Sequence, residues 1–172
     1  IVIEMREAGI EPPTICILDE NGKLKDEVYD VLDVIAKYNM ILASSHLSHE
    51  ETFALVKEAK ARKVERIVIT HVDFPTTFYT VEEQKELLKY GAYMEHCYTT
   101  FATGKVDFAE TLNQIKAIGP DHVILGTDLG QKTAPYPDEG LEEFATKLYE
   151  NGFSADDVRK MTVKNPTALV EG

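Results

Sequence analysis

Short apolar runs alternate with amphipathic stretches along most of the chain. The runs are rich in Ile and Val, and the segments between them space their apolar residues at a helical period. Buried parallel strands of a βα repeat have this pattern, because helices cover the faces of such a sheet. We therefore predict an α/β domain with about five parallel strands joined by crossover helices. The predicted strands start near Thr14, Met40, Arg66, Ala92 and Val123.

Helix signals lie between these runs. Apolar residues keep a helical period over 26–38, which predicts an amphipathic crossover helix. Ser48 with Glu51, and Thr80 with Glu83, have the spacing of a capping box and predict helices over about 49–62 and up to about Gly91. Other local signals predict helices over residues 1–9 and 139–151, and helices that start at Asp107, Ser154 and Lys164. Asn21-Gly22 predicts a turn.

Four of the apolar runs end in a side chain that can bind a metal ion. These side chains are His46, His71, His96 and Asp128, and the three histidines follow one another at intervals of 25 residues. A strand, two loops and a crossover helix need about this length. In parallel sheets, ligands bind at the C-terminal ends of the strands. The pattern therefore places a row of imidazoles and a carboxylate on one rim of the sheet.

Each of these residues also has an ordinary structural interpretation. His46 can be a loop histidine that bonds to the backbone, and Asp128 can form an Asx turn or cap a helix. His71 ends the apolar run IVIT, where a buried ring needs a partner or a metal. Two neutral imidazoles and a carboxylate on neighbouring strand ends suit a borderline divalent ion. We therefore predict a metal site, most simply for Zn2+, made by His46, His71 and Asp128.

Three further polar residues lie near the same rim. Glu95 and His96 are adjacent, and because strand side chains alternate, only one of them can point into a barrel. Asp73 follows the run IVITH by two residues and either orients a ligand ring or forms a turn. We keep Glu95, His96 and Asp73 as candidates for contacting substrate or supporting the ligands. The remaining histidines, His49 and His122, are interpreted as a solvated surface residue and a structural residue at the opposite rim.

Composition narrows the function classes. The chain has 172 residues, a length that suits one domain over residues 1–172. Its net charge of −12 argues against a polyanionic partner such as nucleic acid. No apolar stretch approaches the roughly 18 residues that span a bilayer, and no signal peptide is recognisable, so we expect a cytoplasmic protein with no membrane partner. Cys16 and Cys97 lack CxxC spacing, which indicates neither a disulfide scaffold nor a thiolate zinc site.

The strand-end pattern resembles the metal-dependent hydrolases of the amidohydrolase superfamily. The resemblance rests on histidines that end successive strands, on Gly-Thr-Asp at residues 126–128, and on 164–169, which is similar to an NPAxL-type closing helix. It covers roughly residues 40–172 and implies a (β/α)8 barrel with metal ligands on strands one, five, six and eight. His46 is similar to the strand-five ligand and His71 to the strand-six ligand. Asp128 is similar to the strand-eight aspartate, which binds metal and takes the proton of the attacking water.

The sequence departs from that family at its first strand, because it contains no His-x-His pair. A complete eight-unit barrel also needs about 250 residues. We therefore expect a partial or truncated TIM barrel, the C-terminal part of a longer metal-dependent hydrolase.

The resemblance predicts an enzyme that acts on a small-molecule substrate. In this hypothesis a metal-activated water attacks an amide, ester, lactone or phosphoester, and Asp128 acts as general base. The alternative is a non-catalytic binding or assembly module, whose unpaired edge strand pairs with another chain and forms a homo-oligomer. A metal-free aldolase-type barrel would need a Schiff-base Lys on a strand, and the predicted strands carry none.

Overall fold

Four parallel strands form a sheet at the centre of the chain. The computed structural model describes residues 2–10 and 15–171. In chain order and in spatial order the strands are β1 (Leu42–Ala43), β2 (Ile67–Ile69), β3 (Tyr93–Cys97) and β4 (Val123–Gly126). The parallel register, in which Glu95 lies opposite Ile124, brings the C-terminal ends of the strands to one edge. The predicted α/β class is confirmed.

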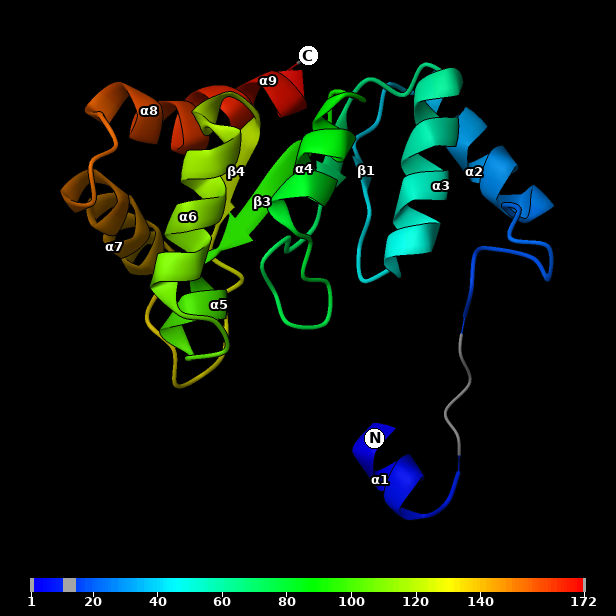
Figure 1. Cartoon of the computed structure of the whole chain (residues 1–172), viewed down its shortest axis with the longest axis horizontal. Coiled ribbons are helices and arrows are strands. Elements are labelled where there is room, and N and C mark those ends of the chain that lie inside the picture. Colours follow the sequence, from blue (N-terminus) through cyan, green and yellow to red (C-terminus); the bar gives the residue numbers. More distant parts are fainter. Residues whose placement is uncertain (1, 11–14, 172) are drawn as a thin grey trace.

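Helices connect the strands and cover one face of the sheet. Figure 1 shows α3, α4 and α6 against that face, and it shows α1 standing apart from the α/β body. A single 3-10 turn, η1, precedes β4, and a π-helical turn, η2, lies between α8 and α9. The bounds are α1 Val2–Glu7, α2 Asp26–Lys37, α3 His49–Ala61, α4 Val81–Leu88, α5 Tyr98–Ala102, α6 Phe108–Ile118, η1 Pro120–His122, α7 Pro137–Glu150, α8 Ala155–Arg159, η2 Lys160–Lys164 and α9 Asn165–Glu171.

Side chains of the strands alternate between two faces that differ in what covers them. The helix face carries Leu42, Ile67, Ile69, Met94, Val123 and Leu125, all buried. The opposite face, here called the inner face, lines a cavity of about 440 Å³ together with residues of α9. The cavity lining includes Ala43, Val68, Glu95 and Ile124 from the strands, and Thr70 directly after β2.

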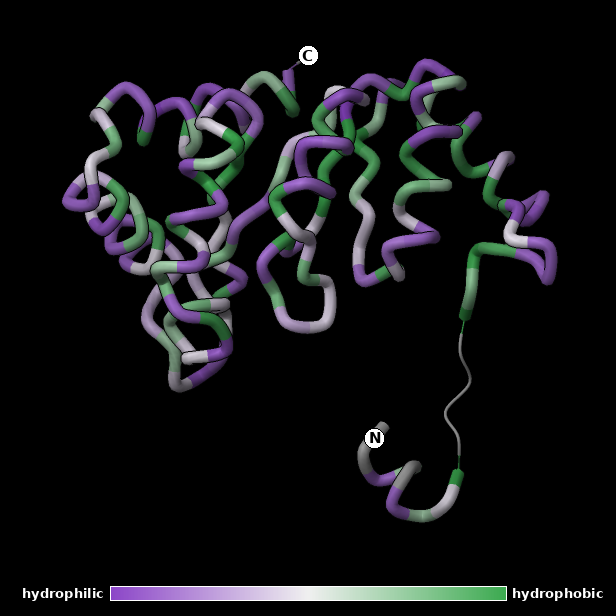
Figure 2. The backbone as a smooth tube through the Cα atoms, viewed as in Figure 1, coloured by the Kyte–Doolittle hydropathy of each residue, from purple (hydrophilic) through white to green (hydrophobic). Residues whose placement is uncertain are grey.

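The apolar core has two parts. The first fills the space between β1 to β3 and helices α2 to α4, where Leu32, Ile67 and Leu87 are fully buried. The second surrounds β4 and includes Ile115 of α6 and Phe144 of α7. Figure 2 shows hydrophilic and hydrophobic residues alternating along the helices, as expected for helices that bury one side. Each buried Leu or Ile contributes roughly 1.5–3 kcal/mol, so this packing holds the strand ends in place.

The local helix signals are confirmed where they were predicted. Capping boxes form at Ser48, Thr80 and Ser154, and the side chain of Asp107 caps α6. The short helix α5 was not predicted. It follows β3 directly, and its N-cap residue Cys97 makes no capping hydrogen bond, so the sequence carries no start signal for it.

The predicted strand from Thr14 is wrong for the part that the structure describes. Thr14 itself lies outside the described residues, and Leu18 forms only an isolated antiparallel bridge with Leu24. The Asp19 carboxylate accepts two N–H groups of the following turn at 2.8 and 2.9 Å, and Gly22 adopts a φ of 73°. The turn reverses the chain before it can pair with β1, so the sheet has four strands instead of five.

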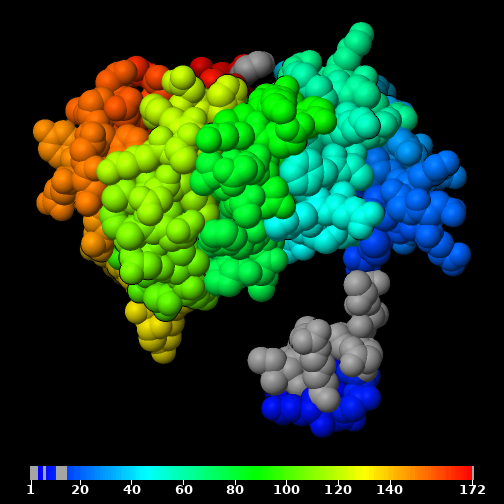
Figure 3. Space-filling view, in the orientation of Figure 1, coloured from blue at the N-terminus to red at the C-terminus, as the bar shows by residue number. Residues whose placement is uncertain are grey.

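The outer shape is marked by one projecting loop. Figure 3 shows the segment between β4 and α7, coloured yellow, extending beyond the body. This segment lies at the end of the sheet where the strands terminate (Figure 1).

Within the described ranges, no helix combines the length and the apolar character needed to cross a membrane.

Glu51 joins the start of α3 to the segment that precedes α2. Its Oε1 accepts the Ile17 N–H at 2.8 Å, and its Oε2 accepts the N–H and the hydroxyl of Ser48 at 3.0 and 2.7 Å. Burial opposes the ionised form, but the hydrogen bonds from Ser48, Ile17 and Cys16 lower the pKa of Glu51 from 4.5 to about 2. A carboxylate with a lowered pKa stabilises the fold above its unfolded pKa, and this stability is lost as the pH falls through the folded pKa.

We expect Glu51→Gln to lower the free energy of unfolding at neutral pH by roughly 2–3 kcal/mol. The stability of the unaltered chain should fall as the pH decreases from 4.5 towards about 2, and that of the variant should fall less. Urea unfolding at a series of pH values measures both. Glu50→Gln is the matched control, since Glu50 is exposed; its effect should stay within about 0.5 kcal/mol. Identical pH profiles for Glu51→Gln and the unaltered chain would contradict this account.

Candidate metal centre

Metal-capable side chains gather where the four strands end. His71 follows β2, while Glu95 and Cys97 lie two residues apart on β3 and therefore on the same face. One potential ligand atom from each of these three residues lies within 4.8 Å of the other two. The Nδ1 atom of His71 is 3.3 Å from the Cys97 Sγ and 3.4 Å from the Glu95 Oε2. We call His71, Glu95 and Cys97 the strand-end cluster.

His46 lies beside this cluster. Its ring centroid is 5.4 Å from that of His71, with the rings edge to face at 75°. The ring of Phe74 lies close to both imidazoles, at 6.3 Å from His46 and 6.0 Å from His71. Two of the three predicted ligands, His46 and His71, are therefore neighbours, although they come from different strand ends.

Asp128 is held on the β4 side of the cluster. Its carbonyl accepts the Thr99 hydroxyl at 2.9 Å, which fixes the loop after β4 against the start of α5. Burial and then the negative charges of Glu95, Asp128 and Asp73 raise the pKa of the Cys97 thiol well above its ordinary value. Asp128 thus acts electrostatically on the cluster, while its carboxylate is not one of the three atoms grouped within 4.8 Å.

The backbone at this rim adopts a costly conformation. Ser45, His71 and Asp128 have φ values of 54°, 51° and 51°, in the left-handed region that residues other than glycine seldom occupy. Each follows a different strand, β1, β2 or β4. Such conformations cost on the order of 1–3 kcal/mol and concentrate at functional sites, where the surrounding structure enforces them.

Strand alternation decides between Glu95 and His96. Glu95 lies on the inner face with His71, and His96 is fully buried on the helix face. His96 therefore cannot contact a substrate at the cluster. The Asp73 carboxylate bonds to His96, with 3.1 Å between Oδ2 and Nδ1, so the ring that Asp73 orients is not that of a predicted ligand.

The Asp73–His96 pair anchors the loop that follows β2. Both side chains are fully buried, and Asp73 Oδ2 also accepts the Thr111 hydroxyl of α6 at 2.6 Å. Burial opposes the ionised form, but the charge and hydrogen bond of His96 and the hydrogen bond of Thr111 hold the pKa of Asp73 below its ordinary value. The pair therefore ties the loop after β2 to β3 and to α6.

Cys97 is the residue that sequence reasoning missed. It was set aside because no second cysteine lies at metal-binding spacing, but its partners are His71, just after β2, and Glu95 on its own strand. The available signal was its place two residues after Glu95, directly after the run that ends in His96. The donor set of the cluster is one imidazole, one carboxylate and one thiol, and these are ligands that Zn2+ accepts.

The other two histidines lie outside the cluster. His49 was predicted to be a solvated surface residue, but it is only partly exposed. Its ring stacks on Tyr79 at 4.3 Å, and its Nδ1 is 2.8 Å from Glu83 Oε1, so it links α3 to α4. His122 lies in η1, just before β4, at the opposite end of the strands as predicted, with its ring 5.0 Å from that of Tyr93.

Fold and site together define an α/β parallel-sheet domain with a cluster of metal-capable side chains at its strand ends. Comparison with protein families shows that the chain belongs to DUF6282, a family of unknown function, whose profile matches residues 4–95. The matched segment includes His46, His71 and Glu95 but ends before Cys97 and Asp128. A comparison with curated proteins finds no match.

We expect Asp73→Ala to lower the free energy of unfolding by about 3–5 kcal/mol, because it leaves the His96 ring buried without its carboxylate partner. Urea unfolding followed by circular dichroism measures the change. Asp121→Ala removes the exposed ion pair with Lys160 and serves as the control; it should cost less than about 1 kcal/mol. Equal effects of the two substitutions would show that the buried pair does not anchor the loop.

Proposed function

We propose that the chain is a metal-dependent hydrolase of the amidohydrolase type, and that β1 to β4 correspond to the last four strands of a (β/α)8 barrel. The observation that carries this proposal is the meeting of His71, Glu95 and Cys97 at adjacent strand ends, with His46 beside them. Such convergence from separate strands is the arrangement by which parallel βα folds build active sites.

The terminal helix supports the comparison with these barrels. Asn165, the first residue of α9, is buried, and its side-chain amide donates to the Pro120 carbonyl at 2.9 Å and to the Val123 carbonyl at 2.7 Å. These bonds hold α9 at the start of β4, where it covers part of the inner face. The segment that is similar to an NPAxL-type closing helix therefore has a structural reason for its Asn.

The donor set determines how an ion would be held. His71 would contribute nitrogen, Glu95 oxygen and Cys97 sulfur, and His46, whose ring centroid is 5.4 Å from that of His71, is the nearest candidate for a second imidazole among the predicted ligands. Glu95 and Cys97 are outside the ligand pattern that the resemblance implies, so the proposed centre differs from that pattern on β3. A bound divalent ion, most simply Zn2+, would supply Lewis acidity and a water of lowered pKa.

Asp128 is the proposed general base. Its side chain is exposed at the strand-end rim, and the backbone around it is held by Thr99. Its carboxylate would accept the proton of the attacking water as the water adds to the substrate. Amides, esters, lactones and phosphoesters all undergo this type of hydrolysis, so the proposal extends to each of these bond types.

The metal centre predicts one tightly bound Zn2+ per chain in a calorimetric titration. His71→Ala should weaken that binding by more than roughly tenfold, because it removes a ligand. With Co2+ as the probe, the unaltered chain should show the near-ultraviolet absorption of a cobalt-bound thiolate, and Cys97→Ser should abolish that band. His122→Asn is the control, since His122 lies at the opposite end of the strands and its loss should leave both readouts unchanged.

Unchanged Zn2+ affinity in His71→Ala would contradict the metal centre. Another outcome would favour the alternative, a binding or assembly module. Two features support that alternative: the apolar inner face, and the exposed residues Met40 and Ile41 next to the edge strand β1. That outcome is a stable oligomer in sedimentation that takes up no Zn2+.

We expect Asp128→Asn to reduce the hydrolysis of p-nitrophenyl esters or phosphates by roughly 10²–10⁴-fold while Zn2+ binding persists. Asn tolerates the positive φ of this position, so the backbone should be unaffected. Steady-state kinetics beside the Zn2+ titration measures both properties. Asp121→Asn controls for the loss of a surface carboxylate. Full turnover by Asp128→Asn would exclude Asp128 as the general base.

A further inference from the structure

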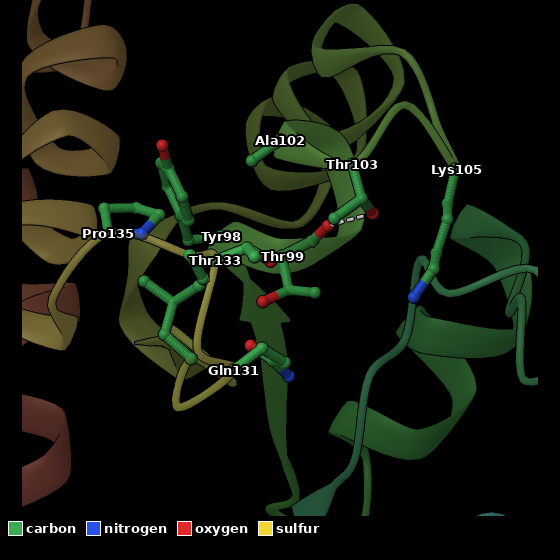
Figure 4. Close-up of a pocket in the computed structure, with 10 residues that line it drawn as sticks. Tyr98, Thr99, Ala102, Thr103, Lys105, Gln131, Thr133 and Pro135 are labelled. Atoms are coloured by element: carbon green, nitrogen blue, oxygen red, sulfur yellow. Dashed lines mark hydrogen bonds between the residues drawn. The ribbon is translucent and has the colours of Figure 1, made fainter.

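A second recess lies next to Asp128, between α5 and the projecting loop after β4. Its volume is about 400 Å³, within the range of pockets that hold small molecules. Figure 4 shows Tyr98 and Pro135 on one side, Lys105 on the opposite side, and Thr99 and Gln131 between them. We call this recess the α5 pocket.

The charge of the α5 pocket is opposite to that of the chain. The whole chain has 30 Asp and Glu residues against 18 Lys and Arg residues. The described residues that line the pocket include the cation of Lys105 and no carboxylate. Within the part of the chain that the structure describes, Lys105 forms no ion pair, and its Nζ lies over the Phe74 ring at 4.5 Å from the centroid. Lys105 is exposed, and its positive charge at the edge of the pocket attracts an anionic group.

The remaining walls set the other properties of a ligand. Leu129, Ala102 and Pro135 present apolar surface, while Thr133 adds a hydroxyl group at the rim. A molecule that fits all of these features carries one anionic oxygen group at Lys105 and an apolar body against the loop after β4. An anionic molecule without an apolar part meets only the charge requirement, and a cationic molecule does not meet it.

The α5 pocket adjoins the loop that carries Asp128. The Thr99 hydroxyl and the Gln131 amide donate to the Asp128 carbonyl at 2.9 and 3.4 Å, so both residues adjoin the proposed base. On the other side, the Phe74 ring beneath Lys105 contacts the rings of His46 and His71. A molecule in the pocket would therefore lie between Lys105 and the backbone of Asp128.

We infer that the α5 pocket binds a small molecule that bears a carboxylate or phosphate on an apolar body, and that Lys105 recognises the anionic group. The identification of this molecule as the substrate class rests on the proposed hydrolase function, whereas the binding itself does not. The two statements are therefore tested in separate experiments.

The test titrates chelator-treated, metal-free protein with benzoate, phenyl phosphate and the neutral analogue benzyl alcohol. Amide resonances in two-dimensional NMR report the site and the affinity. Benzoate or phenyl phosphate should shift the resonances of Lys105, Leu129 and Gln131, and benzyl alcohol should bind more weakly. Lys105→Gln should weaken binding of the anionic probes by about fivefold, the value of a partly solvated ion pair.

Lys132→Gln is the matched control, because it removes the same charge from the projecting loop at an exposed residue that does not line the pocket. Its dissociation constants should stay within about twofold of those of the unaltered chain. Three results would each overturn the inference: no shift of the pocket resonances with either anion, equal binding of benzyl alcohol, or equal affinities in Lys105→Gln and the unaltered chain. The relative affinities of benzoate and phenyl phosphate distinguish a carboxylate ligand from a phosphate ligand. Since no metal is present, this inference and the Zn2+ centre can fail independently.

Discussion

The alternation of side chains along β3 is the constraint on which the rest of the site depends. This strand pairs with β2 on one side and β4 on the other. Its period of two sends Glu95 and Cys97 towards His71, and sends His96 into the core, where it meets Asp73. A slip of one residue would exchange these two sets and bury the carboxylate among apolar helices. The pairing of β3 with its two neighbours therefore decides which residues form the cluster and which residues anchor the core.

The site combines features that only a well-packed scaffold can maintain. Left-handed backbone follows three strands, carboxylates lie near a thiol whose pKa is raised, and the hydrogen-bonded pair of Asp73 and His96 is fully buried. Each feature costs stability when considered by itself. The two apolar clusters offset that cost by holding the sheet against the helices.

Local signals predicted the helices well, because a capping box such as Ser48 with Glu51 is complete within four residues. Pairing between distant segments was harder. Leu18 looked like a strand residue, but the nearby turn at Asp19 pairs it with Leu24. Asp73 was expected to orient a ligand ring or to form a turn, but the sequence did not show that its partner is His96 on the next strand. The strand-end histidines could be predicted from spacing, whereas the role of Cys97 depends on contacts that no spacing rule contains.

Anomalous X-ray diffraction at the zinc edge, from crystals grown with Zn2+, tests the central claim most directly. The account predicts one strong anomalous peak per chain, bounded by the Nδ1 of His71, a carboxylate oxygen of Glu95 and the sulfur of Cys97. A fully occupied ion near His49 or His122, with no peak among these three residues, would contradict it.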